Sequence, residues 1–116
     1  MYVDGFVVPV PKAKLDKYKM WSQKASKMWK DKGALTYVEA VGDDVKPGEV
    51  TSFPQSVKLK DDEVVVFSWI TYNSKEDRDR INKEMMDDPE MKAMGDDMPF
   101  DGKRMFMGGF KPIVEA

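Results

Sequence analysis

The sequence "EVVVFSWITY", residues 63–72, is the strongest strand signal in this chain, and the predicted fold is built around it. β-Branched and aromatic residues fill it, and these residue types are enriched in strands. Its length and its nearly continuous apolar character predict a central strand that is buried on both faces of a sheet. The neighbouring segments then have to supply the other strands and the helices.

Three further strands are predicted around this central one. Residues 2–10 form a short β-rich segment, residues 34–41 ("ALTYVEAV") form a second one, and residues 103–110 form the last strand. The segment 43–62 is rich in turn residues, so we expect a long loop between two strands there, with a short extended piece near residues 56–60.

Two helices are predicted between the strands. The first begins at Pro11, which suits a first helical turn, and its apolar residues recur at helical spacing. The second begins at Ser74, with Asp77 three residues later as a variant of a capping box, and Pro89 breaks it before a short helical turn. The order βαββαβ predicts a single ferredoxin-like α+β domain over residues 1–116, with an antiparallel sheet ordered 4-1-3-2 and both helices on one face.

The charge distribution argues against a nucleic-acid-binding protein. The formal net charge is −2, whereas nucleic-acid binders usually carry a basic surplus. Residues 12–32 hold eight lysines against two aspartates, and residues 76–101 hold ten acidic residues against four basic ones. Because the two helices lie side by side in the predicted fold, we interpret the lysine-rich face as one that the acidic helix compensates, rather than as an RNA patch.

The residue types that are absent exclude several kinds of chemistry. The chain contains no cysteine and no histidine, so we expect no disulfides, thiol nucleophiles or zinc sites and no haem ligation by histidine. The acidic pairs lack the spacing and the glycine of a calcium loop, and no metal site is predicted. The N-terminus lacks the features of a signal peptide and no apolar run approaches a membrane span, so we expect a cytoplasmic protein.

The two faces of the predicted sheet differ in composition, because side chains alternate along each strand. One set of residues mixes large and small apolar groups, and we expect it to pack against the helices: Gly5, Val38, Ala40, Phe67 and Trp69. The other set is partly acidic and partly apolar: Tyr2, Asp4, Phe6, Tyr37, Glu39, Ser68 and Ile70. Such a mixed patch usually marks an interface. We therefore expect a homodimer in which two copies pair through this face, sheet against sheet, into a barrel.

Several separated blocks of the sequence resemble one bacterial family. In chain order they are "YVDGFVVPVP", "GAL", "TSFPQSVKLK", "VVFSWITYNSKEDRD", "EMMDDPEMK" and "MPFDGKRMFMGGF". These blocks look like the YbaA-like family, a family of domains of unknown function within the dimeric α+β barrel group. The resemblance covers nearly the whole chain and implies a ferredoxin-like domain that pairs as a dimer. It implies no activity, and any analogy with the enzymes of related barrel families rests on the fold alone.

Two acidic residues are candidates for a catalytic role. Burial of Asp4 on a central strand would raise the pKa of its carboxyl group and suit it to general acid or base catalysis. Glu39 is the second candidate. The alternative, which we favour, is a carboxylate held by hydrogen bonds or by an ion pair, because structural pairs also perturb the pKa.

Five residues are candidates for ligand binding. Trp69 and Tyr37 could line a small-molecule pocket, although core packing is the commoner role of such side chains. Arg104 offers a planar group that binds anions. Gly108 and Gly109 interrupt the last strand, where glycine marks a bulge or the close approach of a ligand or of another chain.

The methionines suggest where a cavity would lie. Seven of the ten fall between residues 85 and 107. Their flexible side chains either fill gaps in a core or form an adaptable pocket wall. If a cavity is present, we expect it between the second helical region and the last strand.

Two functions follow from these observations. The first is an enzyme or a binding protein for a small molecule, with its pocket between sheet and helices and with Asp4, Trp69 and Arg104 as base, stacking wall and anion clamp. The antiparallel course of the first and last strands, however, places Asp4 and Arg104 at opposite ends of the sheet. The alternative is a non-catalytic dimeric interaction or stress-associated protein. The residues leave open whether the protein is an enzyme.

Overall fold

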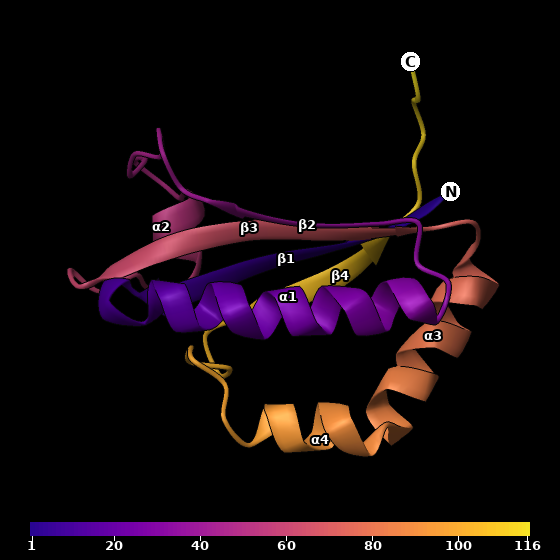
Figure 1. The fold of residues 1–116 in the computed structure, drawn as a ribbon. Helices are drawn as coiled ribbons and strands as arrows, with labels where there is room; N and C mark the ends of the chain where they lie inside the picture. The colour runs from indigo at the N-terminus through magenta and orange to yellow at the C-terminus, as the bar shows by residue number, and fades with distance from the viewer.

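The computed structural model describes residues 1–116 and contains one four-stranded sheet with helices on both of its sides (Figure 1). In chain order the elements are β1 (Tyr2–Pro11), a short 3₁₀ helix η1 (Lys12–Lys14), α1 (Leu15–Asp31), β2 (Thr36–Val41), α2 (Phe53–Ser56), β3 (Glu63–Tyr72), α3 (Lys75–Asp87), α4 (Pro89–Gly95) and β4 (Phe106–Phe110). The sheet is antiparallel throughout, with the order β2-β3-β1-β4. This is the predicted order 4-1-3-2 counted from the opposite edge, so the predicted topology is confirmed.

The strands β1 and β3 form the centre of the sheet. Each has ten residues, and they pair along their whole length, from Tyr2 opposite Tyr72 to Pro11 opposite Glu63. β3 therefore coincides with the predicted central strand and has a neighbour on each side. The shorter strands β2 and β4 form the two edges of the sheet.

Local sequence signals explain where α3 and α4 begin. The side chain of Ser74 accepts a hydrogen bond from the backbone N–H of Asp77, so the predicted N-cap is confirmed. The side chain of Asp88 accepts a hydrogen bond from the N–H of Glu90, and Pro89 occupies the first turn of α4. None of the helices combines the length and the apolar character that a membrane crossing requires.

Several segments differ from the prediction. The first helix does not begin at Pro11, because β1 extends through Pro11 and α1 begins at Leu15 after the 3₁₀ turn, and β2 begins at Thr36 rather than at residue 34. The last strand begins at Phe106 rather than at residue 103, because the carbonyl of Asp101 accepts hydrogen bonds from the N–H groups of Arg104 and Met105 and holds a turn there. The extended piece expected near residues 56–60 is also wrong. The short helix α2 stands just before it, and the side chain of its N-cap residue Ser52 accepts a hydrogen bond from a backbone N–H of the helix.

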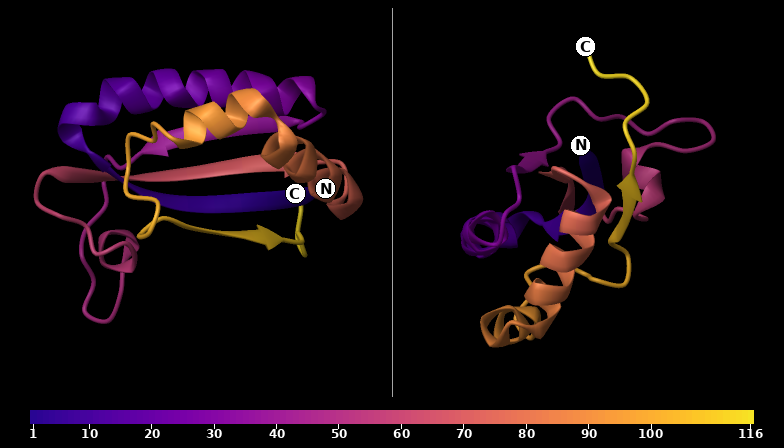
Figure 2. Two further views of the ribbon diagram at one scale, coloured as in Figure 1. Left: turned by 90° about the horizontal axis from the view of Figure 1, so that it is seen from below. Right: turned by 90° about the vertical axis from the view of Figure 1, so that its right-hand side faces the viewer.

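Helices α1, α3 and α4 lie on one face of the sheet, here called the covered face, whereas α2 lies on the other (Figure 1). Figure 2 shows α1 and α4 side by side across the covered face, with α3 at one end. The buried side chains of Ile70 and Tyr72 form a cluster with residues of α1 and α3, and Tyr2, Phe6 and Tyr37 pack against it. The set of residues predicted to face a second copy therefore faces the chain's own helices, and the predicted assignment of the two faces is wrong.

This error has a physical cause. The set of residues that is predicted to form the dimer contact contains the acidic side chains Asp4 and Glu39, and acidic side chains usually lie in contact with water rather than beneath helices. In the folded chain Asp4 is fully buried and forms an ion pair with Arg78 of α3, and Glu39 accepts hydrogen bonds from two tyrosines. Buried polar groups are tolerated when they have such partners. The dimer contact predicted through this face is wrong as well, because the helices occupy it.

The opposite face, here called the open face, is apolar and largely uncovered. It carries the side chains of Val3, Val38, Ala40, Phe67, Trp69, Thr71, Phe106 and Phe110, and Gly5 and Gly108 lie on the same face. The segment around α2 covers one end of this face, where Val57 packs against Val7 and Val65. Elsewhere the face lies open: the exposed fractions are 43% for Phe67 and 61% for Phe110.

Ion pairs between α1 and the region of α4 show that the charges of the two helical regions compensate each other, as predicted. They join Lys17 to Asp97 at 2.9 Å, Lys24 to Glu90 at 3.2 Å and Lys32 to Asp88 at 2.9 Å. The first two are well exposed to solvent, so they contribute little to stability. Three of the eight lysines in residues 12–32 therefore have acidic partners within the chain.

Candidate ligand-binding site

Two cavities adjoin the covered face of the sheet, and they share three residues. The inner cavity, between the sheet and the helices, has a volume of about 320 Å³, and sixteen of its nineteen lining residues are hydrophobic. The outer cavity, of about 440 Å³, lies alongside α1 and β2 and has more polar lining residues, including Lys19 and Ser22. Tyr18, Tyr37 and Glu39 line both cavities.

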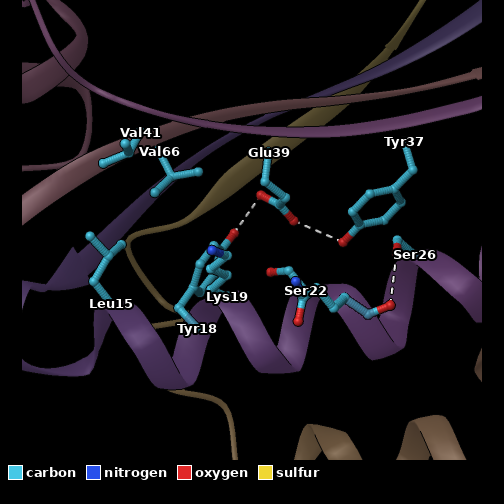
Figure 3. A pocket seen from close by; sticks show the side chains of 10 residues that line it. Leu15, Tyr18, Lys19, Ser22, Ser26, Tyr37, Glu39, Val41 and Val66 are labelled. Atoms are coloured by element: carbon cyan, nitrogen blue, oxygen red, sulfur yellow. Dashed lines mark hydrogen bonds between the residues drawn. The ribbon is translucent and has the colours of Figure 1, made fainter.

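Glu39 lies at the junction of the two cavities, between two tyrosines (Figure 3). Its carboxylate accepts one hydrogen bond from the hydroxyl of Tyr18, at 2.7 Å, and another from the hydroxyl of Tyr37, at 2.8 Å. Tyr37 and Glu39 are two residues apart on β2 and so share a face of the sheet, whereas Tyr18 comes from α1. Glu39 is the only acidic residue that lines either cavity, and no group of three or more acidic side chains is arranged to hold a metal ion.

Both tyrosines remain protonated in this environment. Burial, and after it the negative charge of Glu39, raises the pKa of Tyr18 and of Tyr37 far above the ordinary value. Each hydroxyl therefore donates its hydrogen to Glu39, and its oxygen can still accept another hydrogen bond. The hydroxyl of Ser22 is buried and has no hydrogen-bond partner. It lies close enough to offset a small part of the rise in the tyrosine pKa, without reaching the geometry of a hydrogen bond.

Two aromatic clusters flank this carboxylate, and each provides one of its hydroxyl partners. Tyr18, Trp21 and Phe100 form the first cluster, with ring centroids 5.7 to 6.4 Å apart. Trp29 and Tyr37 form the second, with centroids 6.1 Å apart. Both indole N–H groups donate hydrogen bonds elsewhere in the protein. Because their N–H groups are already paired, the two tryptophans contribute apolar ring atoms to the lining of the inner cavity.

A methionine wall completes the inner cavity. It consists of Met85, Met86, Met91, Met98, Met105 and Met107. These residues come from α3, α4, the segment after α4 and β4, so a cavity is present where the methionine-rich sequence predicted one. Thioether side chains are flexible and can adapt to ligands of different shape.

Asp4 lines neither cavity and forms a buried ion pair that joins β1 to α3. Its side chain is fully buried, and Nε and Nη2 of Arg78 lie 3.0 and 2.9 Å from Oδ1. The hydroxyl of Tyr72 and the amide of Asn82 donate to Oδ2, at 3.1 and 3.4 Å. Asn82 also lines the inner cavity, so this hydrogen-bond network borders the site without placing Asp4 in it.

Arg104 lies at the other end of the sheet, where acidic side chains of the same chain bind its guanidinium group. Nη1 and Nη2 donate to the two carboxylate oxygens of Glu63, at 2.8 and 2.6 Å, and Nε donates to Asp101 at 2.8 Å. These contacts lower the pKa of the Glu63 carboxyl group. Arg104 lines neither cavity and is not close to Asp4, as the antiparallel strands predicted.

The remaining candidates are divided between the two faces of the sheet. Tyr37 and Glu39 meet in the site described above. Trp69 borders the inner cavity as part of the sheet, but its ring lies beside Phe67 on the open face, with centroids 5.7 Å apart.

The two glycines of β4 have different surroundings. A Cβ atom at Gly108 would lie 3.6 Å from the ring of Phe110, which is an ordinary contact. A Cβ atom at Gly109 would lie 2.5 Å from the hydroxyl of Tyr2 and 2.6 Å from Nη2 of Arg78. Gly109 therefore makes room for the side chains that surround the Asp4 ion pair, and neither glycine lines a cavity.

Comparison with known proteins identifies the family of the chain. The family described as "Protein of unknown function (DUF1428)" matches residues 1–102. The chain belongs to the DUF1428 family. "Uncharacterized protein YbaA" of Escherichia coli strain K12 is 54% identical to it over 114 residues, which cover 98% of this chain and 97% of the relative. The protein of the same name from Shigella flexneri has the same identity and coverage. The predicted resemblance to the YbaA-like family is confirmed.

The fold of this DUF1428 protein also occurs in a solved structure. The crystal structure of a dimeric ferredoxin-like protein from an uncultured marine organism matches it with a TM-score of 0.64, covering 100% of this chain and 98% of that chain. The two sequences are 10% identical, so the likeness concerns the fold alone. It supports the ferredoxin-like topology predicted from the order of strands and helices.

Sequence reasoning did not find two polar residues of the candidate site, Ser22 and Asn82. Ser22 follows Tyr18 by four residues in a helix and therefore shares its face, which is a signal that the sequence contains. Asn82 has no comparable signal, because its position at the cavity depends on how α3 packs against β1.

Proposed function

We propose that this DUF1428 protein binds a small, mostly apolar molecule in the inner cavity, with a polar group of the ligand at Glu39. The arrangement of Glu39, Tyr18 and Tyr37 at the junction of two cavities carries this proposal. Ligand sites usually combine an apolar lining with a few converging polar groups. The volume of about 320 Å³ lies at the lower end of the range of about 300–1,000 Å³ that such sites occupy.

Two features of the site carry a free-energy cost in the protein without a ligand, and a bound molecule would remove it. Protein interiors are close-packed, and a cavity of this size forgoes packing contacts. In addition, the buried hydroxyl of Ser22 has no partner, and such a group costs about 1–3 kcal/mol. A ligand that fills the inner cavity removes the first cost, and a ligand whose polar group reaches Ser22 across the junction with the outer cavity removes the second as well.

A cavity-filling variant tests the proposal. Met107 lines the inner cavity and is 48% exposed, so Met107→Trp adds bulk there without forcing a large side chain into a closed core. Met20→Trp is the matched control, because Met20 is 70% exposed on α1 and lines neither cavity. A thermal-shift screen of small aromatic amines, alcohols and acids should find compounds that stabilise the wild type and Met20→Trp much more than Met107→Trp, by mass action on the native state.

Two outcomes of this screen would contradict the proposal. Equal stabilisation of both variants would place the ligand outside the inner cavity. The absence of any stabilising compound among molecules small enough for the cavity would remove the reason for treating it as a binding site.

We also infer that the protein forms a homodimer through the open face, in the manner of a dimeric α+β barrel. Soluble monomers rarely expose contiguous apolar patches of this kind, and the structurally similar ferredoxin-like protein is dimeric. The C-terminal residues extend from the sheet on the same side (Figure 1), and Ile113 and Val114 are 93% and 83% exposed. A second copy would bury these side chains together with the phenylalanines of the open face.

Substitution on the open face tests the dimer. Phe67→Glu places a charge at the centre of the proposed interface, and the 43% exposure of Phe67 leaves room for it in a folded monomer. Light scattering coupled to size exclusion should give a dimeric mass for the wild type and for the control Met20→Glu, and a monomeric mass for Phe67→Glu. A monomeric wild type at micromolar concentration would contradict this inference.

A further inference from the structure

We infer that the ligand of the inner cavity is an organic cation, with an apolar body and a protonated amine that binds at Glu39. This inference rests on the proposed function and adds to it the chemical class of the ligand. The charges, the acceptor atoms and the aromatic walls of the site support it independently.

Glu39 is a carboxylate without a cationic partner in the chain. None of the ion pairs of the protein includes it. Lys19 is the only lysine or arginine that lines either cavity, and it is exposed, borders the outer cavity and forms no ion pair. The other inward-facing acidic group of the sheet, Asp4, has Arg78 as its partner. A ligand cation would give Glu39 the partner that it lacks.

The polar atoms around Glu39 are mostly acceptors. The hydroxyl hydrogens of Tyr18 and Tyr37 already point at the carboxylate, so their oxygens can only accept further hydrogen bonds. The hydroxyl of Ser22, which lines the outer cavity, has no partner and can accept a hydrogen bond as well as donate one. An ammonium group supplies three N–H donors, which matches this set, whereas a ligand carboxylate would bring two acceptors and a like charge.

The walls of the cavity suit the same chemistry. Trp21 and Trp29 lie on the two sides of Glu39, each in contact with one of its tyrosine partners. Aromatic faces attract cations through their quadrupole, and tryptophan is the most effective of them. The remaining lining is apolar and methionine-rich, so it suits the hydrocarbon part of the same molecule.

Three probes that share a phenyl ring and differ in their polar group test the inference. They are 2-phenylethylamine, 2-phenylethanol and 3-phenylpropionate, each titrated by isothermal calorimetry at neutral pH. With the wild type we expect the amine to bind about tenfold more tightly than the alcohol, and the carboxylate to bind most weakly. With Glu39→Gln, which keeps the shape of the side chain, the advantage of the amine over the alcohol should fall to about twofold or less.

The pattern of outcomes separates this inference from the proposed function. Binding of the alcohol with the affinity of the amine, or tighter binding of the carboxylate, would overturn the choice of a cation and leave small-molecule binding intact. Binding of none of the three probes would overturn both. If Glu39→Gln does not fold, calorimetry of the wild type in two buffers of different ionisation enthalpy serves in its place: an amine that binds as a cation releases no proton at neutral pH, so its binding enthalpy should be the same in both buffers, and release of about one proton per bound amine would overturn the inference.

Discussion

The Asp4–Arg78 ion pair determines which side chains fit around it at one end of the sheet. Asp4 is fully buried and the side chain of Arg78 is 19% exposed, so the pair lies largely out of water. Removal of one partner from such a pair typically costs about 3–5 kcal/mol, because it leaves an uncompensated charge. The ring of Tyr2 lies beneath the guanidinium group of Arg78, 5.2 Å away, and adds a cation–π contact.

The two glycines of β4 give a matched test of this arrangement. Gly109→Ala should destabilise the protein by about 1–3 kcal/mol, because the new methyl group displaces Tyr2 and Arg78 from their positions around Asp4. Gly108→Ala should change stability by about 0.5 kcal/mol or less, because its Cβ meets only the ring of Phe110 at an ordinary distance. Urea unfolding of the two variants checks this, and equal costs would contradict the account of Gly109.

The pair formed by Arg104 and Glu63 should make stability depend on pH. Arg104 holds the pKa of the Glu63 carboxyl group below its ordinary value of 4.5. The folded state then binds fewer protons than the unfolded state around that pH, so the stabilisation is complete above about pH 5 and is lost as the pH falls through the folded-state pKa. Asp101 acts in the same direction, because Arg104 also lowers the pKa of its carboxyl group.

Arg104→Met removes this contribution. At about pH 7 the variant should be clearly less stable than the wild type, and the difference should shrink at an acid pH below the folded-state pKa of Glu63, where the wild type has also lost the charge on Glu63. Urea unfolding at the two pH values measures it. Lys75→Met, which breaks an exposed pair with Asp79, is the control and should change stability little at either pH, because water screens the pair. An Arg104→Met deficit that does not change with pH would contradict the assignment.

Among the secondary-structure elements, the N-cap side chains determine where α3 and α4 begin. Ser74→Ala should cost about 1 kcal/mol, because it removes the acceptor for the backbone N–H of Asp77. Ser26→Ala is the matched control: Ser26 lies inside α1, where its hydroxyl donates back to the carbonyl of Gln23, and alanine there should be neutral or slightly stabilising. A Ser74→Ala variant as stable as Ser26→Ala, measured by thermal unfolding, would contradict the role of the cap.

Strand order and the starts of α3 and α4 could be predicted from the sequence because local signals determine them, whereas the start predicted for the first helix, Pro11, is the last residue of β1. β3 has the predicted bounds since its β-branched and aromatic run has turn residues on both sides, and Ser74 with Asp77 marks the start of α3. The face of the sheet that meets the helices could not be predicted. That choice depends on partners such as Arg78 and Tyr18, which are distant in sequence from the acidic residues that they satisfy.

The candidate site could be predicted only in part for the same reason. Tyr37 and Glu39 share a face of one strand, and the methionine-rich segment indicated the cavity. Arg104 was proposed as an anion clamp, yet the chain provides Glu63 and Asp101 as its partners. The sequence shows which interactions a side chain can form. The packing of the chain determines whether another residue already forms them.

In the molecule as a whole, we assign different functions to the two faces of the sheet. The covered face and the helices form the cavity, and the open face forms the proposed dimer contact. Since residues of a single chain line both cavities, we expect the monomeric variant Phe67→Glu to bind 2-phenylethylamine within about twofold of the wild-type affinity. Calorimetry on the purified monomer measures this, and a complete loss of binding would show that the site needs the second copy.

A crystal structure of the protein grown with saturating 2-phenylethylamine would show whether the inner cavity binds a cation at Glu39. We expect electron density for the phenyl ring between Trp21 and Trp29, with the amine nitrogen within hydrogen-bonding distance of Glu39. An inner cavity that holds only water while the compound is bound elsewhere, or not at all, would contradict this expectation.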